Sequence, residues 1–191
     1  MAHKVFYIFR HGETDFNREG RWQGAGHNPE LNLAGVAQAH LRPLGMRIIY
    51  SSPLQRALQT AEIIGRELHI PVIVNNDLIE GNFGINEGQY HKDIILTEEY
   101  KNWRNLDAEY IHFRFEGGES KYEIMQRMFA AVSALLETPE EVIGISSHSA
   151  AIRCLMLQFG LKMKRLENGA LLRLTYNDGT WSVEEICDDS E

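Results

Sequence analysis

Four side chains, in three short stretches of the sequence, could together bind and transfer a phosphoryl group. Arg10 and His11 stand in FRHGET, Arg56 follows the triplet SSP, and His148 follows a second apolar run. A guanidinium group matches phosphate oxygens bidentately, and a neutral imidazole can act as a nucleophile. If the fold brings them together, these residues would form a positive pocket for a tetrahedral dianion.

Each histidine cluster follows an apolar run that is typical of a buried parallel strand. Residues 5–9 precede Arg10, and residues 142–145 precede His148 by two serines. Residues 47–50 and 72–74 are further strand candidates. Because the carboxyl ends of parallel strands meet at one edge of a sheet, we expect all four side chains to lie at that edge.

Helical patterns lie between and after these strands. In residues 53–64 apolar side chains repeat on one helical stripe, and Pro53 suits a first helical turn. A second helix is expected to begin at Ser120, which can form a capping box with Glu123. The triplet NDG at 177–179 predicts a hairpin between residues 170–176 and 180–186. Strands that alternate with helices predict an α/β fold.

The composition fits an ordinary globular chain of one domain, with 191 residues of which 43% are hydrophobic. The formal charge of −8 gives no general attraction to nucleic acid or to an anionic membrane, so bound phosphate would need a local arginine cluster. No apolar run is long enough for a secretory signal or a membrane span. Cys154 and Cys187 have no metal-ligand spacing, and we expect reduced thiols in a cytoplasmic protein.

Six sequence blocks occur in an order that resembles the histidine phosphatase superfamily, the phosphoglycerate mutase-like proteins. The blocks are RHGETDFN, GRWQG, SSPLQRALQTA, LIEGNFGINEG, GGES and SSHSAAIR. They span nearly the whole chain, from residue 5 to about residue 186. The resemblance implies a three-layer α/β/α fold with a mostly parallel mixed sheet, in a single domain of residues 1–191. Residues 81–118 would then form a lid or rim.

The resemblance also implies roles for individual residues. His11 would be the nucleophile that becomes phosphohistidine, and Glu80 the proton donor. The residues expected to bind the phosphoryl group are Arg10, Arg56 and His148, with Asn17, Gln23 and Gly24 as further lining residues. No metal or other cofactor is expected. Because His11 must be neutral while Glu80 is protonated, we predict a bell-shaped, mildly acidic rate profile.

Several alternatives stay open at this point. Asp77 and Glu87 are nearby carboxylates that could take the place of Glu80. The resemblance implies that mutases carry longer segments over the site, and the stretch between residues 80 and 120 is compact here. This favours a phosphatase on a small phosphate monoester, with a mutase second and a non-catalytic binding protein third. The substrate and the oligomeric state cannot be read from the sequence.

Other phosphatase and hydrolase chemistries fit poorly. The stretch GISSH at 144–148 has His where a serine-hydrolase elbow needs Gly, so Ser146 is a poor nucleophile candidate. No arginine lies six residues after either cysteine, and no glycine-rich loop ends in Gly-Lys-Ser or Gly-Lys-Thr.

The chain departs from the family pattern in places that bear on specificity. His27 stands where relatives usually carry Asp, and Ser149 with Ala150 replaces a common pair of glycines. The segment 35–48 is short, and Pro43 should truncate its helix. Trp22, Phe83 and Trp103 could border the pocket, and Arg104 could meet an acidic substrate tail. We expect the aromatic residues in the core, however, and His91 and Arg104 in structural or solvated positions.

Overall fold

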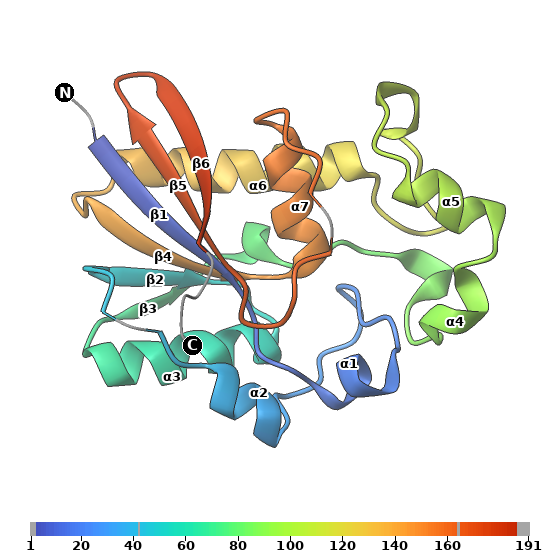
Figure 1. The fold of residues 1–191 in the computed structure, drawn as a ribbon, viewed down its shortest axis with the longest axis horizontal. Coiled ribbons are helices and arrows are strands. Elements are labelled where there is room, and N and C mark those ends of the chain that lie inside the picture. The colour runs from blue at the N-terminus through green and yellow to red at the C-terminus, as the bar shows by residue number, and fades with distance from the viewer. Residues whose placement is uncertain (1–2, 42, 164, 187–191) are drawn as a thin grey trace.

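The computed structural model describes residues 3–41, 43–163 and 165–186 and has an α/β fold around one six-stranded sheet (Figure 1). The sheet order is β3-β2-β4-β1-β5-β6. The strands are β1 (His3–Arg10), β2 (Ile48–Ser51), β3 (Val72–Val74), β4 (Val142–Ser147), β5 (Leu171–Asn177) and β6 (Thr180–Ile186). Strands β1 to β4 are parallel, and the β5–β6 hairpin adds two antiparallel strands beside β1. The expected mixed, mostly parallel sheet is therefore confirmed.

Helices cover both faces of this sheet, as the alternation of side chains along β1 requires. Phe6 and Ile8 point to the face covered by α6 (Lys121–Ala134) and α7 (Ser149–Leu157). Phe9 points to the opposite face, where it packs with Ile64 of α3 (Gln55–Leu68). Figure 1 shows the three layers, with α6 and α7 on one side of the sheet and α3 on the other.

Two helix starts follow from local sequence. Helix α6 begins after Ser120, whose side chain accepts from the Glu123 backbone while the Glu123 carboxylate accepts from the Ser120 backbone. The predicted capping box is thus confirmed. Helix α3 begins just after Pro53 and runs past the predicted end at residue 64, because its last residues lack a breaker until His69 takes a left-handed conformation (φ 58°).

The segment before β2 carries a very short helix, α2 (Leu33–Gln38), capped by the side chain of Asn32. The helix is truncated as expected, but Pro43 is not the residue that ends it. The last helical residue, Gln38, already lies five positions before the proline.

The hairpin β5–β6 turns through Asp178 and Gly179, since Asn177 pairs with Thr180. Both turn residues have positive φ, 44° and 93°, which suits the two-residue turns that match strand twist.

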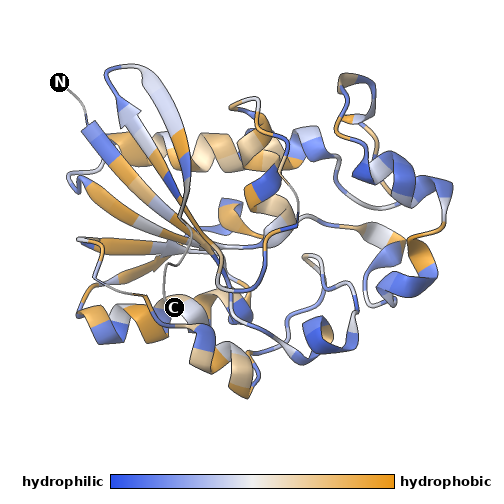
Figure 2. Ribbon diagram, viewed as in Figure 1, coloured by the Kyte–Doolittle hydropathy of each residue, from blue (hydrophilic) through white to orange (hydrophobic). Residues whose placement is uncertain are grey.

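Between β3 and α6 the chain leaves the sheet and forms short helices to one side of it (Figure 1). These are α4 (His91–Ile94), α5 (Glu98–Arg104) and the 3-10 turns η1 (Asn76–Leu78), η2 (Gly84–Asn86) and η3 (Ala108–Tyr110), while α1 (Asp15–Glu19) follows β1 and η4 (Leu135–Glu137) follows α6. Figure 2 shows hydrophobic residues concentrated in the strands and in α6 and α7, whereas the α4–α5 region is largely hydrophilic. Within the described residues, no helix is long and apolar enough to cross a membrane.

Candidate active site

The carboxyl ends of β1, β2 and β4 bring the predicted site together. Arg10 is the last residue of β1 and pairs in register with Ser147 of β4. The backbone N–H of His11 donates to the Ser147 carbonyl at 3.1 Å, so that His11 and His148 follow neighbouring strand ends. Their ring centroids are 5.1 Å apart.

His11 is held in one tautomer by its own turn. Its Nδ1–H donates to the Gly12 carbonyl at 2.6 Å, which leaves the Nε2 lone pair for the pocket. The side chain is 2% exposed, and burial, followed by the charges of Arg56 and Arg10, holds its pKa well below 6.5. A Cβ on Gly12 would lie 2.3 Å from the Gly35 carbonyl oxygen, so close packing against α2 requires this glycine. His11 is therefore a neutral imidazole presented to the pocket.

His148 lies behind this surface rather than in the pocket wall. It is fully buried, and its Nε2 shares a 2.7 Å hydrogen bond with the Ser52 hydroxyl after β2. Burial, then Arg56 and His11, keep its pKa well below 6.5. Its buried Nδ1 has no hydrogen-bond partner among the described residues.

Arg10 and Arg56 flank His11 and are fixed by backbone carbonyls. Arg10 Nη1 donates to Leu166 at 2.6 Å, and Arg56 donates from Nη1 to His27 and from Nη2 to Gly24, both at 2.8 Å. Burial is the main reason that the pKa of each falls to about 10, so both remain cationic near neutral pH. The unusual His27 thus contributes its carbonyl group, which any residue could supply.

Asn17 stands at the pocket edge with its amide orientation fixed. Its Oδ1 accepts from the Thr14 backbone and hydroxyl and from Asn168 Nδ2, each at 3.2 Å. Its amide N–H groups are consequently the part left for the pocket. Asn168 also donates to the His11 carbonyl at 3.0 Å, a role that no sequence signal pointed to.

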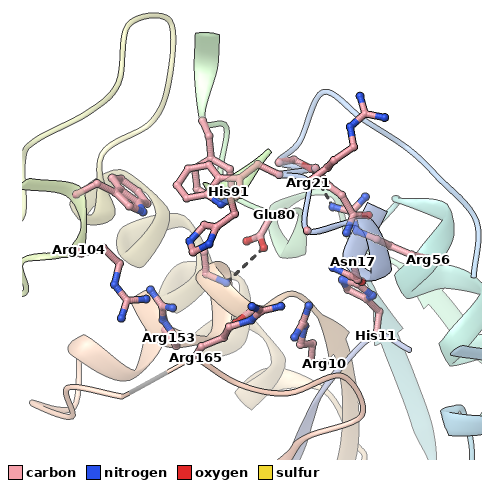
Figure 3. A pocket seen from close by; sticks show the side chains of 18 of the residues that line it. Arg10, His11, Asn17, Arg21, Arg56, Glu80, His91, Arg104, Arg153 and Arg165 are labelled. Carbon is pink, nitrogen blue, oxygen red and sulfur yellow. Dashed lines mark hydrogen bonds between the residues drawn. The ribbon is translucent and has the colours of Figure 1, made fainter. Parts of the chain in front are cut away.

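Among the three candidate carboxylates, the pocket wall contains Glu80 (Figure 3). Glu80 Oε1 accepts from the backbone N–H groups of Gly81 and Ala151, and its Oε2 has a longer contact of 3.3 Å with the Ala150 N–H. Glu87 instead accepts from the backbone N–H groups of Ala25, Gly26 and Phe83. It ties the 81–118 segment to the loop that carries Gln23 and Gly24, both of which line the pocket.

The outer wall of the pocket was largely missed from the sequence. The cavity has a volume of about 180 Å³, and its wall contains Trp22, Phe83 and Trp103, which were expected in the core alone. His91, expected to be structural, also lines it, and its Nε2 lies 2.7 Å from the Tyr100 hydroxyl. Further lining residues are Gly20, Arg21, Arg104, Ser149, Ala150, Arg153 and Arg165. Aromatic and basic residues in a loop-rich segment give no periodic signal of facing a pocket.

Two remaining expectations concern thiols and metal ligands. Cys154 is a free thiol buried in α7, and burial raises its pKa to about 12, while Cys187 lies outside the described residues. Over 3–41, 43–163 and 165–186, no group of three or more His, Cys, Asp or Glu side chains could hold a metal ion.

Known proteins that are similar to this chain include both a named phosphoglycerate mutase and a named phosphatase. "Probable phosphoglycerate mutase GpmB" of Citrobacter koseri is 36% identical over 188 residues, covering 92% of this chain and 86% of the relative. A mycobacterial glucosyl-3-phosphoglycerate phosphatase, solved with VO3, has a TM-score of 0.84 at 26% identity. The match covers 95% of this chain and 98% of the mycobacterial chain. Bacillus stearothermophilus YhfR has a TM-score of 0.83, also at 26% identity, covering 95% and 96%.

The family comparison agrees with the blocks around the strand ends. The model described as "Histidine phosphatase superfamily (branch 1)" matches residues 6–189, a range that includes every predicted site residue. The chain belongs to the histidine phosphatase superfamily, branch 1.

Proposed function

We propose that this protein is a phosphomonoesterase that forms a phosphohistidine on His11 and acts on a small phosphorylated metabolite. The observation that carries the proposal is the neutral imidazole of His11, buried between two cationic guanidinium groups with Nε2 left for the pocket. A cavity of about 180 Å³ favours a small substrate.

In the first step the Nε2 lone pair attacks phosphorus, and the bond between phosphorus and the ester oxygen breaks. Arg10 and Arg56 balance the charge on the equatorial oxygens, and because they are fixed beforehand they need no reorganisation. A protonated Glu80 gives its proton to the departing alkoxide. We assign this proton to Oε2, because Oε1 already accepts two short backbone hydrogen bonds.

In the second step the Glu80 carboxylate takes a proton from water, and the hydroxide formed attacks phosphorus as the N–P bond breaks. Inorganic phosphate leaves, and both His11 and Glu80 return to their starting states. Because the pKa of His11 lies well below 6.5, the acid limb of the profile should fall below that pH.

Residues 81–118 would form the rim of this site. Five residues of the segment line the pocket: Phe83, His91, Tyr100, Trp103 and Arg104. Arg104 and, from the opposite loop, Arg165 are exposed, so water can reach the outer pocket. Open access of this kind favours hydrolysis of the phosphohistidine over its return to a bound intermediate.

Phosphoglycerate mutase activity is the second candidate, because the curated relative that is 36% identical carries that name. Phosphate release from a panel of monoesters, with EDTA present, should be measured for wild type and His11→Ala. Release that is lost in the variant supports the phosphatase. Interconversion of phosphoglycerates that depends on 2,3-bisphosphoglycerate, without net release, would replace it with the mutase.

Trapping of the phosphoenzyme separates both enzymes from a binding protein. Wild type quenched without acid should carry phosphohistidine, and His11→Ala should not. A folded wild-type protein with neither turnover nor label would contradict the proposal.

A further inference from the structure

Three arginines gather at the side of the pocket away from His11. Arg104 ends α5, Arg153 lies in α7, and Arg165 lies in the loop between α7 and β5. Figure 3 shows Arg104 and Arg153 on the side of Glu80 opposite to His11, with the Arg165 side chain reaching from there toward Arg10. We call them the outer arginine cluster.

None of these guanidinium groups has an ion pair or hydrogen bond to another described residue, and the buried Nε of Arg153 is unpartnered. Other arginines of the chain are paired, such as Arg127 with Glu119 at 2.9 Å. The chain has 27 acidic and only 19 basic side chains, so carboxylates to pair with are abundant. Among the described residues that line the pocket, Glu80 is the one carboxylate, and it forms no ion pair with the outer arginine cluster.

The cationic groups in the pocket also disfavour one another. Burial lowers the pKa of Arg10, and the charge of Arg165 lowers it further. His91, on the same wall, has a lowered pKa because of burial and then the charges of Arg165 and Arg104. Like charges that converge without a counterion are costly and favour a bound anion.

One phosphoryl group does not account for both arginine sets. Arg10 and Arg56 flank His11 and would bind the phosphoryl group that is transferred. Arg104 and Arg153 lie beyond Glu80, where a substrate bound at His11 could extend along the pocket, and Arg165 lies between them and Arg10. A cavity of about 180 Å³ has room for a short remainder.

We infer that the outer arginine cluster binds a second anionic group on the substrate, a carboxylate or a second phosphate. This inference rests on the proposed function for the position of the first phosphoryl group. It narrows the substrate class to short phosphate monoesters with an anion at the far end, and it assigns selectivity to Arg153 and Arg165 in particular.

The test compares ligands that differ in that second group. Binding of 3-phosphoglycerate and of glycerol 3-phosphate is measured by calorimetry in the His11→Ala background, where turnover is absent. Propane-1,3-diol bisphosphate and its monophosphate form a second pair, which distinguishes phosphate from carboxylate. Arg165→Gln and Arg153→Gln are added in turn, with the exposed Arg66→Gln of α3 as the matched control.

In at least one pair, we expect the ligand with the second anionic group to bind about 10- to 100-fold more tightly than the ligand without it. This is the range for charge-assisted hydrogen bonds. Arg165→Gln should reduce this ratio about tenfold, and Arg66→Gln should leave it unchanged. Because Arg165 is exposed, its substitution tests the inference even if Arg153→Gln fails to fold.

A ratio near one for both pairs, or a ratio that Arg165→Gln does not change, would overturn the inference, as would a failure of every ligand to bind. None of these outcomes depends on hydrolysis. A protein that discriminates the pairs but releases no phosphate would contradict the proposed function and leave the second-anion site standing.

Discussion

At the strand ends, the guanidinium of Arg56 is 1% exposed and held by two backbone carbonyls, whereas that of Arg165 in the outer wall is exposed and unpaired among the described residues. The inner pocket, formed by Arg10, His11, Arg56 and Glu80 with His148 behind it, is built on the ends of a buried sheet. The outer wall comes largely from α4, α5 and loops, a region that is largely hydrophilic (Figure 2).

This difference separates two tasks. Groups that stabilise a transition state must be oriented before the reaction, and the inner pocket supplies that through backbone hydrogen bonds. Groups that select a substrate can be long, solvated side chains that order on binding, at some cost in conformational entropy. We therefore expect substitutions inside to reduce turnover of every substrate and substitutions outside to change the ranking of substrates.

The largest effect is expected for Glu80→Gln. For an alkyl phosphate kcat should fall about 100- to 10,000-fold, because the alkoxide then leaves without a proton. For p-nitrophenyl phosphate, whose leaving group needs no proton, the fall should be much smaller. Steady-state kinetics on both substrates checks this. An equal loss on both would mean that Glu80 acts by holding the α7 backbone rather than by proton transfer.

Arg56→Gln should lower kcat/KM about 100- to 1,000-fold for phosphate monoesters with and without a second anionic group, because a fixed cation is lost from the transition state. Arg66→Gln in the same helix is the matched control and should retain wild-type kinetics, since Arg66 is exposed in the last turn of α3 and does not line the pocket. If Arg56→Gln changed the ratio of 3-phosphoglycerate to glycerol 3-phosphate turnover, Arg56 would also contribute to substrate selectivity. That result would contradict the assignment of selectivity to the outer wall.

Asn168→Ala should have an intermediate effect. It removes the two hydrogen bonds that Asn168 donates to the His11 carbonyl and Asn17 Oδ1. At about 1 kcal/mol each, the loss of both bonds should lower kcat/KM by up to about 30-fold, with the substrate ratio unchanged. Inhibition by inorganic phosphate provides a second readout, since a misplaced Asn17 should weaken it. Unaltered phosphate inhibition would leave Asn168 a purely structural residue.

The inner pocket could be predicted from the sequence because its residues stand next to strong local signals. His11 and His148 each follow a short apolar run, and Arg56 sits in the first turn of an amphipathic helix. Parallel pairing of β1, β2 and β4 then leaves little freedom for where these residues end up. The capping box at Ser120 and the hairpin at Asp178-Gly179 were readable for the same reason, since local chemistry determines both.

The outer wall could not be predicted in this way. Arg165 and Asn168 lie in a loop without periodicity, and their positions depend on tertiary contacts such as that between Asn168 and Asn17. Trp103 is 3% exposed and belongs to the core cluster, yet it also lines the pocket, so its residue type alone could not separate the two roles. The division between core and wall is decided by packing across segments that are distant in the sequence.

The smallest effect concerns stability, and it follows from two buried histidines, His11 in the inner pocket and His148 behind it. The pKa of His11 and of His148 lies well below 6.5 in the folded protein, so each binds its proton more readily after unfolding. The contribution of each neutral histidine to the free energy of unfolding is therefore fully present above pH 6.5. It decreases as the pH falls, by about 1.4 kcal/mol per pH unit for each histidine, until the folded protein is protonated too.

His11→Asn should remove the contribution of one histidine to this pH dependence. Urea unfolding at pH 7.5, 6.5 and 5.5 measures the slope, and the same substitution at the exposed His69 controls for loss of an imidazole as such. If His11→Asn keeps the wild-type slope, His11 is not held neutral by the fold, and the nucleophile proposed for the inner pocket loses its physical basis.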